Sequence, residues 1–496
     1  MIRTILDPSS VQDYERFLKI KSLPSFRFHG RTAIIPDEYA AALGLEEHVQ
    51  PATTYQPHPR MFDYQRDIAR MAADKGSYCI FADCGLGKTL IFLDMVKHWR
   101  TILPKHQTIM ILSPLMVIQQ TIDEAREFYG DDLTLEQVHA ADLAARLRSR
   151  AGGIIITNYD ALRDDTPKGN LGAMVLDESS MLKSHYGKWG TTCLRLGKGL
   201  RFKLACTGTP APNDRIEYAN HAVFMGAFPT VNSFLARFFV NKGQTSERWI
   251  LKPHAMRPFY RALSHWCIFL TNPATYGWRD NTESIPPIQI HIEDVKLTSE
   301  QQELAYQSTG SLFVDQIGGI TSRSVLSQIA KGNHRGRSVD TRKPAFIKAR
   351  VDSWPDESTI IWCKYNAEQE LIAATFPHAH SITGATTHDD RMRMIEDFKA
   401  GRCRVMISKP KILGFGLNLQ IATRQVFSGL QDSYEEFYQA VKRSNRYGST
   451  RPLNVHIPVT DIERPMIDTV LRKAAMVQRD TEAQERIFKE SSYVNA

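Results

Sequence analysis

A glycine-rich stretch, FADCGLGKT at residues 81–89, contains the residue types that bind a phosphate group. Its candidate phosphate-binding residues are Gly85, Gly87, Lys88 and Thr89. Glycines let backbone N–H groups curl around phosphate oxygens, Lys88 would reach the β and γ phosphates of ATP, and Thr89 would hold Mg²⁺. The strict phosphate-loop pattern has a glycine where this chain has Ala82, so the stretch alone is also compatible with an ordinary turn between a strand and a helix.

An acidic pair, Asp177 and Glu178, follows a second apolar run in MVLDESS. In phosphate-loop enzymes such a pair divides the work: the first carboxylate anchors Mg²⁺, and the second orients and deprotonates the attacking water. An Asp-Glu pair at the end of a strand is often only a surface feature. Its place on a predicted parallel strand, downstream of the glycine-rich loop, favours the catalytic interpretation.

Two further stretches carry side chains that would complete such a site. Thr207 and Thr209, in ACTGTPAPND (205–214), form either an ordinary exit from a strand or a relay from the hydrolysis site to a second lobe. Gln439, Arg443 and Arg446, in EEFYQAVKRSNRYGS (435–449), are spaced so that we expect them on one face of a helix. Spacing alone leaves these arginines as solvated surface charge, which is the usual fate of a basic helix face.

Short apolar runs rich in Ile and Val predict the strands that position these residues. The first group comprises YCIFA (78–82), TIMILS (108–113), GIIIT (153–157), AMVLD (173–177) and KLACT (203–207), and the second comprises TIIWC (359–363), RVMIS (404–408), RQVFS (424–428) and LNVHI (453–457). Such runs, separated by amphipathic stretches, indicate parallel strands covered by helices on both faces. Two groups predict two α/β lobes, with helices and a linker between them at about 215–350.

The composition of the chain is that of a globular protein with a polyanionic partner. It has 496 residues, a formal net charge of +8 and a sequence pI near 9.0, which favours nucleic acid as the partner. The 7 cysteines form no CxxC pair or Cys/His cluster, so neither a zinc site nor a disulfide framework is indicated. The N-terminus lacks the apolar core of a signal peptide, and no run is long enough for a membrane helix. We therefore expect a soluble protein of a reducing cytoplasm, with no membrane partner.

Taken in order, ADCGLGKT, LDESSMLKS and CTGTPAPN resemble motifs I, II and III of superfamily-2 helicases and translocases, in particular the Swi/Snf-like branch. Three downstream blocks are similar to that branch as well: VKLTSEQQELAYQS (295–308), SITGATTHDDRMRMIEDFKAG (381–401) and GFGLNLQIATRQVF (414–427). The resemblance covers about residues 60–450 and departs at Thr383, where the family usually has an Asp. It implies two tandem RecA-like lobes with parallel sheets, a helical insertion between them, and nucleic-acid-stimulated hydrolysis of ATP with Mg²⁺.

The resemblance also implies roles for individual residues. Gln65, in FDYQRDIARM, would read the adenine edge, and Gly416 would belong to the ATP site. Gln439, Arg443 and Arg446 would form motif VI and reach the γ-phosphate from the second lobe. Other motif residues would contact nucleic acid, namely Ser113, Asn158, Tyr159, Thr207, Thr209 and Asn418.

A basic segment, KGNHRGRSVDTRKPAFIKAR at 331–350, belongs to none of these motifs. It contains one acid, Asp340, against the basic residues Lys331, Arg335, Arg337, Arg342, Lys343, Lys348 and Arg350. A solvated loop and an electrostatic track for nucleic acid are both compatible with this composition. We assign Arg335 and Arg337 to nucleic-acid binding.

These observations predict the domains and the function. We expect an N-terminal region of unknown role (1–55), a first lobe with a helical extension (56–285) and a second lobe (286–496). The predicted function is an ATP-dependent DNA helicase or translocase that moves along or remodels duplex or branched DNA without reading its sequence. It would act as a monomer or loose oligomer with replication or recombination partners.

The departures from well-known RNA helicases decide the expected substrate. Motif II reads Asp-Glu-Ser-Ser, and Gln439 stands where their motif VI has a leading His, which favours DNA over RNA. The compact chain favours a bacterial or phage type, in the cytoplasm of a bacterium or an infected cell. The alternatives are an RNA helicase, a motor subunit of a restriction or defence assembly, and a nucleic-acid-binding protein with an inactive ATPase.

Overall fold

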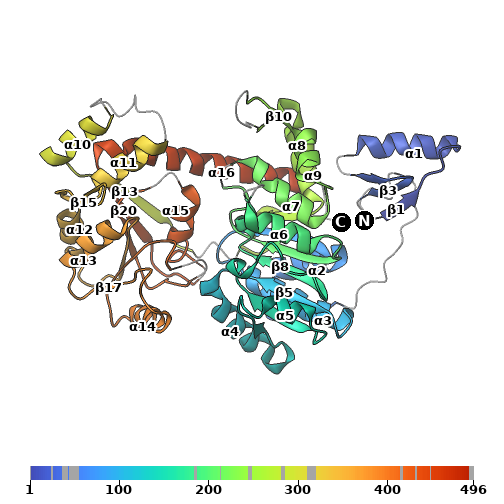
Figure 1. The fold of residues 1–496 in the computed structure, drawn as a ribbon, viewed down its shortest axis with the longest axis horizontal. Coiled ribbons are helices and arrows are strands. Elements are labelled where there is room, and N and C mark those ends of the chain that lie inside the picture. Colours follow the sequence, from blue (N-terminus) through green and yellow to red (C-terminus); the bar gives the residue numbers. More distant parts are fainter. Residues whose placement is uncertain are drawn as a thin grey trace. The chain divides into compact units, whose positions relative to one another are not determined.

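The chain forms two compact units, Met1–Asp280 with Arg479–Ala496, and Asn281–Gln478 (Figure 1). The computed structural model describes residues 2–23, 26–35, 43, 55–183, 187–212, 214–243, 249–280, 285–309, 320–413, 417–430, 433–446 and 448–490. The motif order predicts a second lobe that runs to residue 496, whereas the segment from Arg479 groups with the first unit.

A parallel sheet forms the centre of the first unit. Within its described residues, seven strands lie in the order β12 (Cys267–Leu270), β4 (Ser77–Ala82), β9 (Phe202–Cys206), β8 (Leu171–Asp177), β5 (Thr108–Leu112), β7 (Gly153–Thr157) and β6 (Glu136–Gln137). The five apolar runs predicted for this lobe all form strands. Because these strands are parallel, the residues after β4, β8 and β9 emerge at one edge of the sheet.

Helices cover both faces of this sheet because alternate strand residues point to opposite sides. Residues such as Ile80, Ile111 and Val175 pack in a core with α2 (Asp63–Lys75), α3 (Lys88–Ile102) and α4 (Ile118–Tyr129). Their strand neighbours, such as Phe81 and Leu176, pack with α5 (Leu143–Arg148), α6 (Lys188–Gly197), α7 (Tyr218–Met225), α8 (Val231–Phe238) and α9 (Met256–Ser264). A hairpin, β10 (Phe239–Asn241) and β11 (Trp249–Leu251), follows α8.

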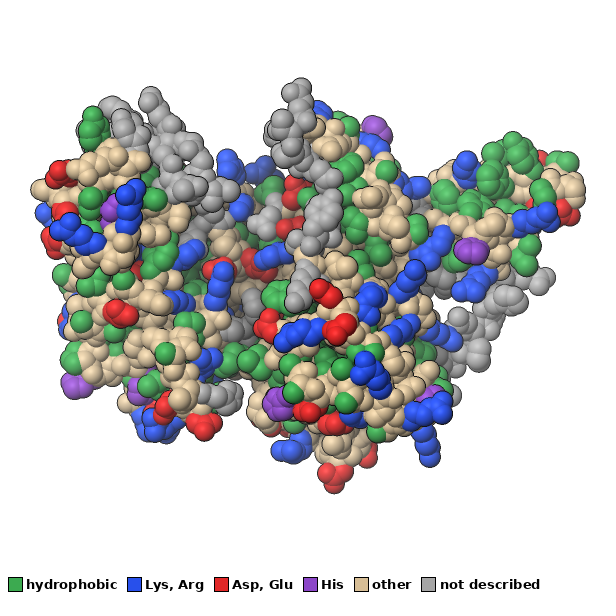
Figure 2. All heavy atoms as spheres, in the orientation of Figure 1, with side chains coloured by type: hydrophobic (Ala, Val, Ile, Leu, Met, Phe, Trp, Pro, Cys, Tyr) green, Lys and Arg blue, Asp and Glu red, His purple; other side chains and the backbone are tan. Residues whose placement is uncertain are grey.

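The N-terminal region folds as a small element of its own. It contains β1 (Ile2–Ile5), α1 (Val11–Ser22), β2 (Arg27–His29) and β3 (Thr32–Ile35), with the strands antiparallel in the order β1-β3-β2. Ile20 and Ile35 are fully buried between the helix and the strands. Val11, Tyr14 and Leu18 on the opposite face of α1 are exposed, and Figure 2 shows hydrophobic side chains gathered over this helix.

The second unit contains another parallel sheet. Its described strands lie in the order β13 (Ile288–Asp294), β20 (Leu453–Val459), β19 (Arg424–Phe427), β16 (Thr359–Trp362), β18 (Val405–Ser408) and β17 (His380–Ser381). All four runs predicted for this lobe form strands. Strands β12 and β13, which the sequence patterns did not predict, lie at the edges of the two parallel sheets.

The helices of the second unit also form two layers. Ile347 and Ile372, from α12 (Lys343–Asp352) and α13 (Asn366–Thr375), pack on one face of the sheet. The other face carries α14 (His388–Lys399), α15 (Tyr434–Val441) and the first part of α16 (Arg464–Glu490). The remaining elements are α10 (Ser299–Thr309), α11 (Ile320–Ala330) and the hairpin β14 (Asn333–His334) and β15 (Arg337–Ser338). None of the described helices has the length and apolar character needed to cross a membrane.

Candidate active site

The glycine-rich loop joins β4 to α3 at the carboxyl edge of the first sheet. Gly85 and Gly87 have φ angles of 88° and 69°, a conformation that glycine adopts without strain. The helix α3 begins at Lys88, which leaves backbone N–H groups of its first turn, including that of Thr89, without partners inside the helix. The loop therefore has the strand, the turn and the helix N-terminus that a phosphate site requires.

The ammonium group of Lys88 lies inside this loop. Its Nζ atom donates to the carbonyl oxygens of Ala82 at 2.8 Å and Asp83 at 3.1 Å. Burial opposes the charged form, but Cys84, Glu178, Asp83 and Asp177 together raise the pKa of Lys88 above its ordinary value. Lys88 is therefore a buried cation beside the acidic pair.

The side chain of Gln65 braces the glycine-rich loop. Its Nε2 atom donates to the Leu86 carbonyl at 3.2 Å, and its Oε1 atom accepts from the backbone N–H of Phe62 at 2.8 Å. A Cβ atom added to Gly87 would overlap the Gln65 amide. Both ends of this buried amide bond to the protein, and its contact with adenine stays a prediction.

The carboxylate of Asp177 ends β8 and is buried. Its Oδ2 atom accepts a hydrogen bond from the Ser113 hydroxyl at 2.8 Å. Burial and the neighbouring charge of Glu178 raise the pKa of Asp177 to about 7, although Ser113 and Lys88 act in the opposite direction. The positive charge around the carboxylate is thus too small to keep the pKa of Asp177 at its ordinary value.

This deficit fits a bound Mg²⁺. A divalent cation at Asp177 would supply the missing positive charge, and the Thr89 hydroxyl is a second oxygen donor on α3. Among the described residues, no group of three or more His, Cys, Asp or Glu side chains is arranged to hold a metal ion.

Glu178 has a strained backbone and a bonded side chain. Its φ and ψ angles are 50° and 53°, a left-handed conformation that is uncommon for residues other than glycine. Its Oε2 atom accepts from the Thr207 hydroxyl at 3.2 Å, and that hydroxyl oxygen accepts from the Thr209 backbone N–H at 3.1 Å. The loop after β9 therefore contacts the carboxylate that would activate water.

Several residues assigned to nucleic-acid binding instead support the acidic pair. Ser113 and Tyr159 are buried, and the Tyr159 hydroxyl donates to the backbone carbonyl of Asp177 at 2.7 Å. Thr207 and Thr209 are also buried, within the bonds described above. Contacts of these four side chains with nucleic acid stay predictions. Asn158 accepts from the backbone N–H of Ala161 at 2.8 Å, and its contact with nucleic acid stays a prediction.

The predicted motif VI helix is shorter than expected. Helix α15 ends at Val441, so Gln439 lies on it while Arg443 and Arg446 lie in the turns that follow. The backbone carbonyl of Arg443 accepts from the Leu419 N–H at 2.9 Å, a bond to motif V that takes the place of a continued helix. The prediction of one shared helix face is therefore wrong.

Arg443 is nevertheless held in a defined position. Its Nη2 atom donates to the Pro410 carbonyl at 3.0 Å, and its guanidinium group lies 5.2 Å from the centre of the Trp362 ring. Gln439 is buried, and Arg446 is partly buried. In motif V, Asn418 bonds to Gln420, and Gly416 lies outside the described residues. The roles of these residues in ATP hydrolysis or nucleic-acid binding stay predictions.

The basic segment 331–350 is divided between surface and interior. Arg335 and Arg337 are exposed on the β14–β15 hairpin, as nucleic-acid contact would require. Lys331 and Lys343 are buried, and their Nζ atoms each lie 2.6 Å from a carboxylate oxygen of Glu463. These two lysines belong to a buried ion cluster, which corrects the interpretation of the whole segment as an open basic track.

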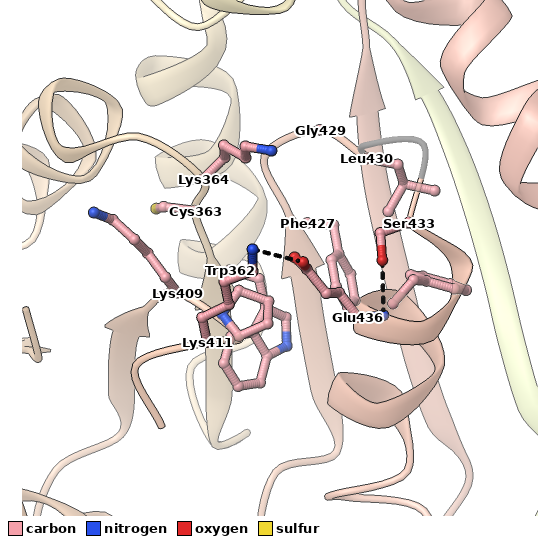
Figure 3. Close-up of a pocket in the computed structure, with 12 residues that line it drawn as sticks. Trp362, Cys363, Lys364, Lys409, Lys411, Phe427, Gly429, Leu430, Ser433 and Glu436 are labelled. Carbon is pink, nitrogen blue, oxygen red and sulfur yellow. Dashed lines mark hydrogen bonds and ion pairs between the residues drawn. The ribbon is translucent and has the colours of Figure 1, made fainter. Parts of the chain in front are cut away.

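The sequence analysis missed a pocket at the carboxyl edge of the second sheet (Figure 3). It encloses about 230 Å³, several times the roughly 30 Å³ of one water molecule. Lys364, Lys409 and Lys411 lie around it, and Lys411 forms an ion pair with Glu436 at 3.1 Å. Lys409 directly follows β18, and Lys364 and Lys411 lie within three residues of the ends of β16 and β18. Their position at the carboxyl ends of parallel strands is the signal that would have identified them.

Two family models match consecutive parts of the chain. The SNF2-related domain matches residues 64–344, and the helicase conserved C-terminal domain matches residues 343–448. The first match contains the glycine-rich loop and the acidic pair, and the second contains motifs V and VI.

Individual relatives are distant. The chain is 22% identical over 441 residues to protein p41 of Acyrthosiphon pisum secondary endosymbiont phage 1, and the match covers 81% of this chain and 92% of p41. It is 22% identical over 500 residues to Zorya protein ZorD of Escherichia coli, covering 87% of this chain and 46% of ZorD, so it spans about half the length of that relative. A solved Sulfolobus solfataricus SWI2/SNF2 ATPase core in complex with dsDNA has 19% sequence identity and a TM-score of 0.40, covering 88% of this chain and 96% of that one.

Proposed function

Because the chain belongs to the SNF2-related family of ATP-dependent helicases and translocases, we propose that it uses ATP hydrolysis to move along or remodel duplex or branched DNA. The observation that carries the proposal is the group formed by Lys88, Asp177 and Glu178 at one edge of the first sheet. This group combines a cation for phosphate oxygens, a carboxylate suited to Mg²⁺ and a second carboxylate for water.

Each side chain has a separate role in the proposed reaction. Lys88 leaves the carbonyls of Ala82 and Asp83 to neutralise the β and γ phosphates of ATP. Asp177 and Thr89 would hold Mg²⁺, which would neutralise charge on the transferred phosphoryl group. Glu178 orients the attacking water and takes its proton, while Thr207 holds the Glu178 carboxylate in place.

The second unit supplies arginines for the same ATP molecule in this proposal. Arg443 and Arg446 stabilise charge on the γ-phosphate as it is transferred, a contribution worth roughly 10³- to 10⁵-fold in related phosphate-loop enzymes. The bonds of Arg443 to Pro410 and Trp362 support this role, because they restrict the guanidinium group before substrate binds.

The pocket lysines support a nucleic-acid substrate. Lys364 and Lys409 present ammonium groups at the pocket, where Lys411 is paired with Glu436, and the chain as a whole has a net charge of +8. Ammonium groups contact phosphates without reading sequence, so the proposed binding to DNA is sequence-independent. The form of motif II and the presence of Gln439 in motif VI favour DNA over RNA as the substrate.

A comparison of polynucleotides tests the proposed substrate. ATP turnover would be measured at one salt concentration with single-stranded DNA, duplex DNA, branched DNA and RNA of equal length. We expect duplex or branched DNA to give the largest stimulation. Stronger stimulation by RNA would overturn the assignment and support an RNA helicase.

A further inference from the structure

The turn that follows Glu178 is held by two consecutive polar residues of α7. The Nδ2 atom of Asn220 donates to the Leu182 carbonyl at 2.6 Å, and the Nε2 atom of His221 lies 3.0 Å from the Ser179 hydroxyl oxygen. All four residues are at most 1% exposed. Neither Asn220 nor His221 belongs to the motifs described above, so nothing in the proposed mechanism uses them.

The environment of His221 is apolar. Its ring meets the edge of Phe81, with the ring centres 5.2 Å apart, and Phe81 lies on the strand that leads into the glycine-rich loop. Burial lowers the pKa of His221 to about 4, against the opposing effect of backbone hydrogen bonds with Glu217 and Ser179. The imidazole is therefore neutral at physiological pH.

A purely structural contact at this place would not need polar side chains. A buried hydrogen bond adds little net stability, and two apolar side chains of similar shape could fill the same space with little or no loss. The strained backbone of Glu178 provides the reason for the bond, because a left-handed glutamate persists only where its surroundings hold it.

We infer that His221 is a positioning residue for ATP hydrolysis: its bond to Ser179 fixes the turn that keeps the Glu178 carboxylate in place for the attacking water. Asn220 holds the other end of the same turn through the Leu182 carbonyl. Glu178 is thus positioned at two places. The Thr207 hydroxyl bonds to its carboxylate, and Asn220 and His221 bond to the backbone turn that follows it. The inference rests on the proposed role of Glu178.

Steady-state kinetics of the full chain with duplex DNA would test this role. We expect His221→Leu and Ser179→Ala each to lower kcat roughly tenfold or more, because a small displacement of a catalytic group is enough for such a loss. The KM for ATP and the affinity for DNA should change less than twofold. His221→Gln, which keeps an amide group at similar reach, should recover most of the lost kcat.

The double variant His221→Leu with Ser179→Ala tests whether the two single variants lose kcat through the same bond. Both single changes remove the same bond, so the double variant should be no slower than the slower single variant. Val223→Ala, on the same helix and packed against the same core, is the control for a loosened α7: it should lower Tm and leave kcat unchanged.

Three outcomes would overturn the inference: an unchanged kcat in His221→Leu, losses that multiply in the double variant, or an equal loss of kcat in Val223→Ala. If His221→Leu does not fold, His221→Gln and Ser179→Ala decide in its place. Glu178→Gln tests the underlying assignment separately. Hydrolysis of ATP by Glu178→Gln at the parent rate would refute the role of Glu178. If Glu178→Gln loses ATP turnover while His221→Leu keeps the parent rate, only the role of His221 is refuted.

Discussion

At the scale of single residues, the protonation of Asp177 sets a testable pH dependence. Burial and the charge of Glu178 raise the pKa of Asp177 to about 7, and only the ionised carboxylate binds Mg²⁺. The Mg²⁺ concentration that gives half-maximal ATP turnover should therefore fall about tenfold between pH 6 and pH 8. Turnover measured in magnesium titrations at several pH values checks this.

Ser113→Ala is the matched variant for that measurement. The Ser113 hydroxyl bonds to Asp177 and lowers its pKa, so removing the hydroxyl should move the transition to higher pH. Phosphates of ATP also titrate near pH 6. The conclusion therefore depends on the difference in pH midpoint between the parent and the variant, and not on the midpoint of either protein alone. Identical pH profiles for the parent and the variant would contradict the assignment of the transition to Asp177.

Gly87 should tolerate no side chain. A Cβ atom there would overlap the Gln65 amide, and the φ angle of 69° adds backbone strain. We expect Gly87→Ala to weaken ATP binding at least tenfold, measured with a fluorescent ATP analogue. Gly130→Ala is the control, because Gly130 has a φ of 56° with no atom within 4 Å of the added Cβ. Equal ATP binding by both variants would show that the Gln65 brace is unimportant.

The sequence predicted which residues gather at the site but not the partner of each side chain. Lys88, Asp177 and Glu178 lie near one another because parallel strands place them at one edge, which the motif order indicates. The partners of Gln65, Ser113 and Tyr159 depend on tertiary packing, and motif spacing carries no information about it. His221 lies in no motif, so only the packing of α7 against the turn after Glu178 indicates a role for it.

At the scale of elements, a buried ion cluster joins three segments of the second unit. Lys331 follows α11, Lys343 begins α12, and Glu463 precedes α16. Both lysines contact the Glu463 carboxylate, and a Cβ atom added to Gly429, which lines the pocket, would contact Glu463 and Lys331. The cluster therefore lies directly behind the pocket wall.

Removing the Glu463 carboxylate should strongly destabilise the fold. Glu463→Ala would leave two buried ammonium groups without a counter-charge, a change that costs about 3–5 kcal/mol of unfolding free energy. Urea unfolding of the full chain measures this, with Glu396→Ala as control. Glu396 pairs with Lys399 at the surface, and its loss should cost less than about 1 kcal/mol. Similar losses for both variants would contradict the buried cluster.

The same cluster has a defined pH window. Burial opposes ionisation of Glu463, but Lys331 and Lys343 lower its pKa from 4.5 to about 2. Its contribution to stability is therefore complete above pH 4.5 and is lost as the pH falls towards 2.

The elements themselves were largely predictable. Nine apolar runs became strands because buried parallel strands require nearly continuous Ile and Val. The edge strand β13 was not predicted because about half of its residues are exposed to solvent. Helix α15 ends at Val441, and the residue spacing that placed Arg443 and Arg446 on it does not indicate where the helix stops. The burial of Lys331 and Lys343 was unpredictable from a charge count, which treats every lysine as exposed.

At the scale of the whole molecule, the basic pocket predicts the salt dependence of DNA binding. The double variant Lys364→Ala with Lys409→Ala should weaken duplex binding. The slope of log K against the log of the salt concentration should become less steep, by the amount that corresponds to about two phosphate contacts. Lys348→Ala, an exposed lysine of α12 outside the pocket, should leave the slope unchanged. Fluorescence anisotropy at several salt concentrations measures both. An unchanged slope in the pocket variant would place the DNA contacts elsewhere.

The most direct test of the whole account is ATP turnover by the parent protein and by Glu178→Gln, each with and without duplex DNA, with Lys88→Ala beside them. We predict that DNA stimulates the parent, and that both variants lose turnover while still folding and binding DNA. Glu178→Gln hydrolysing ATP as fast as the parent, or a parent indifferent to DNA, would contradict the account.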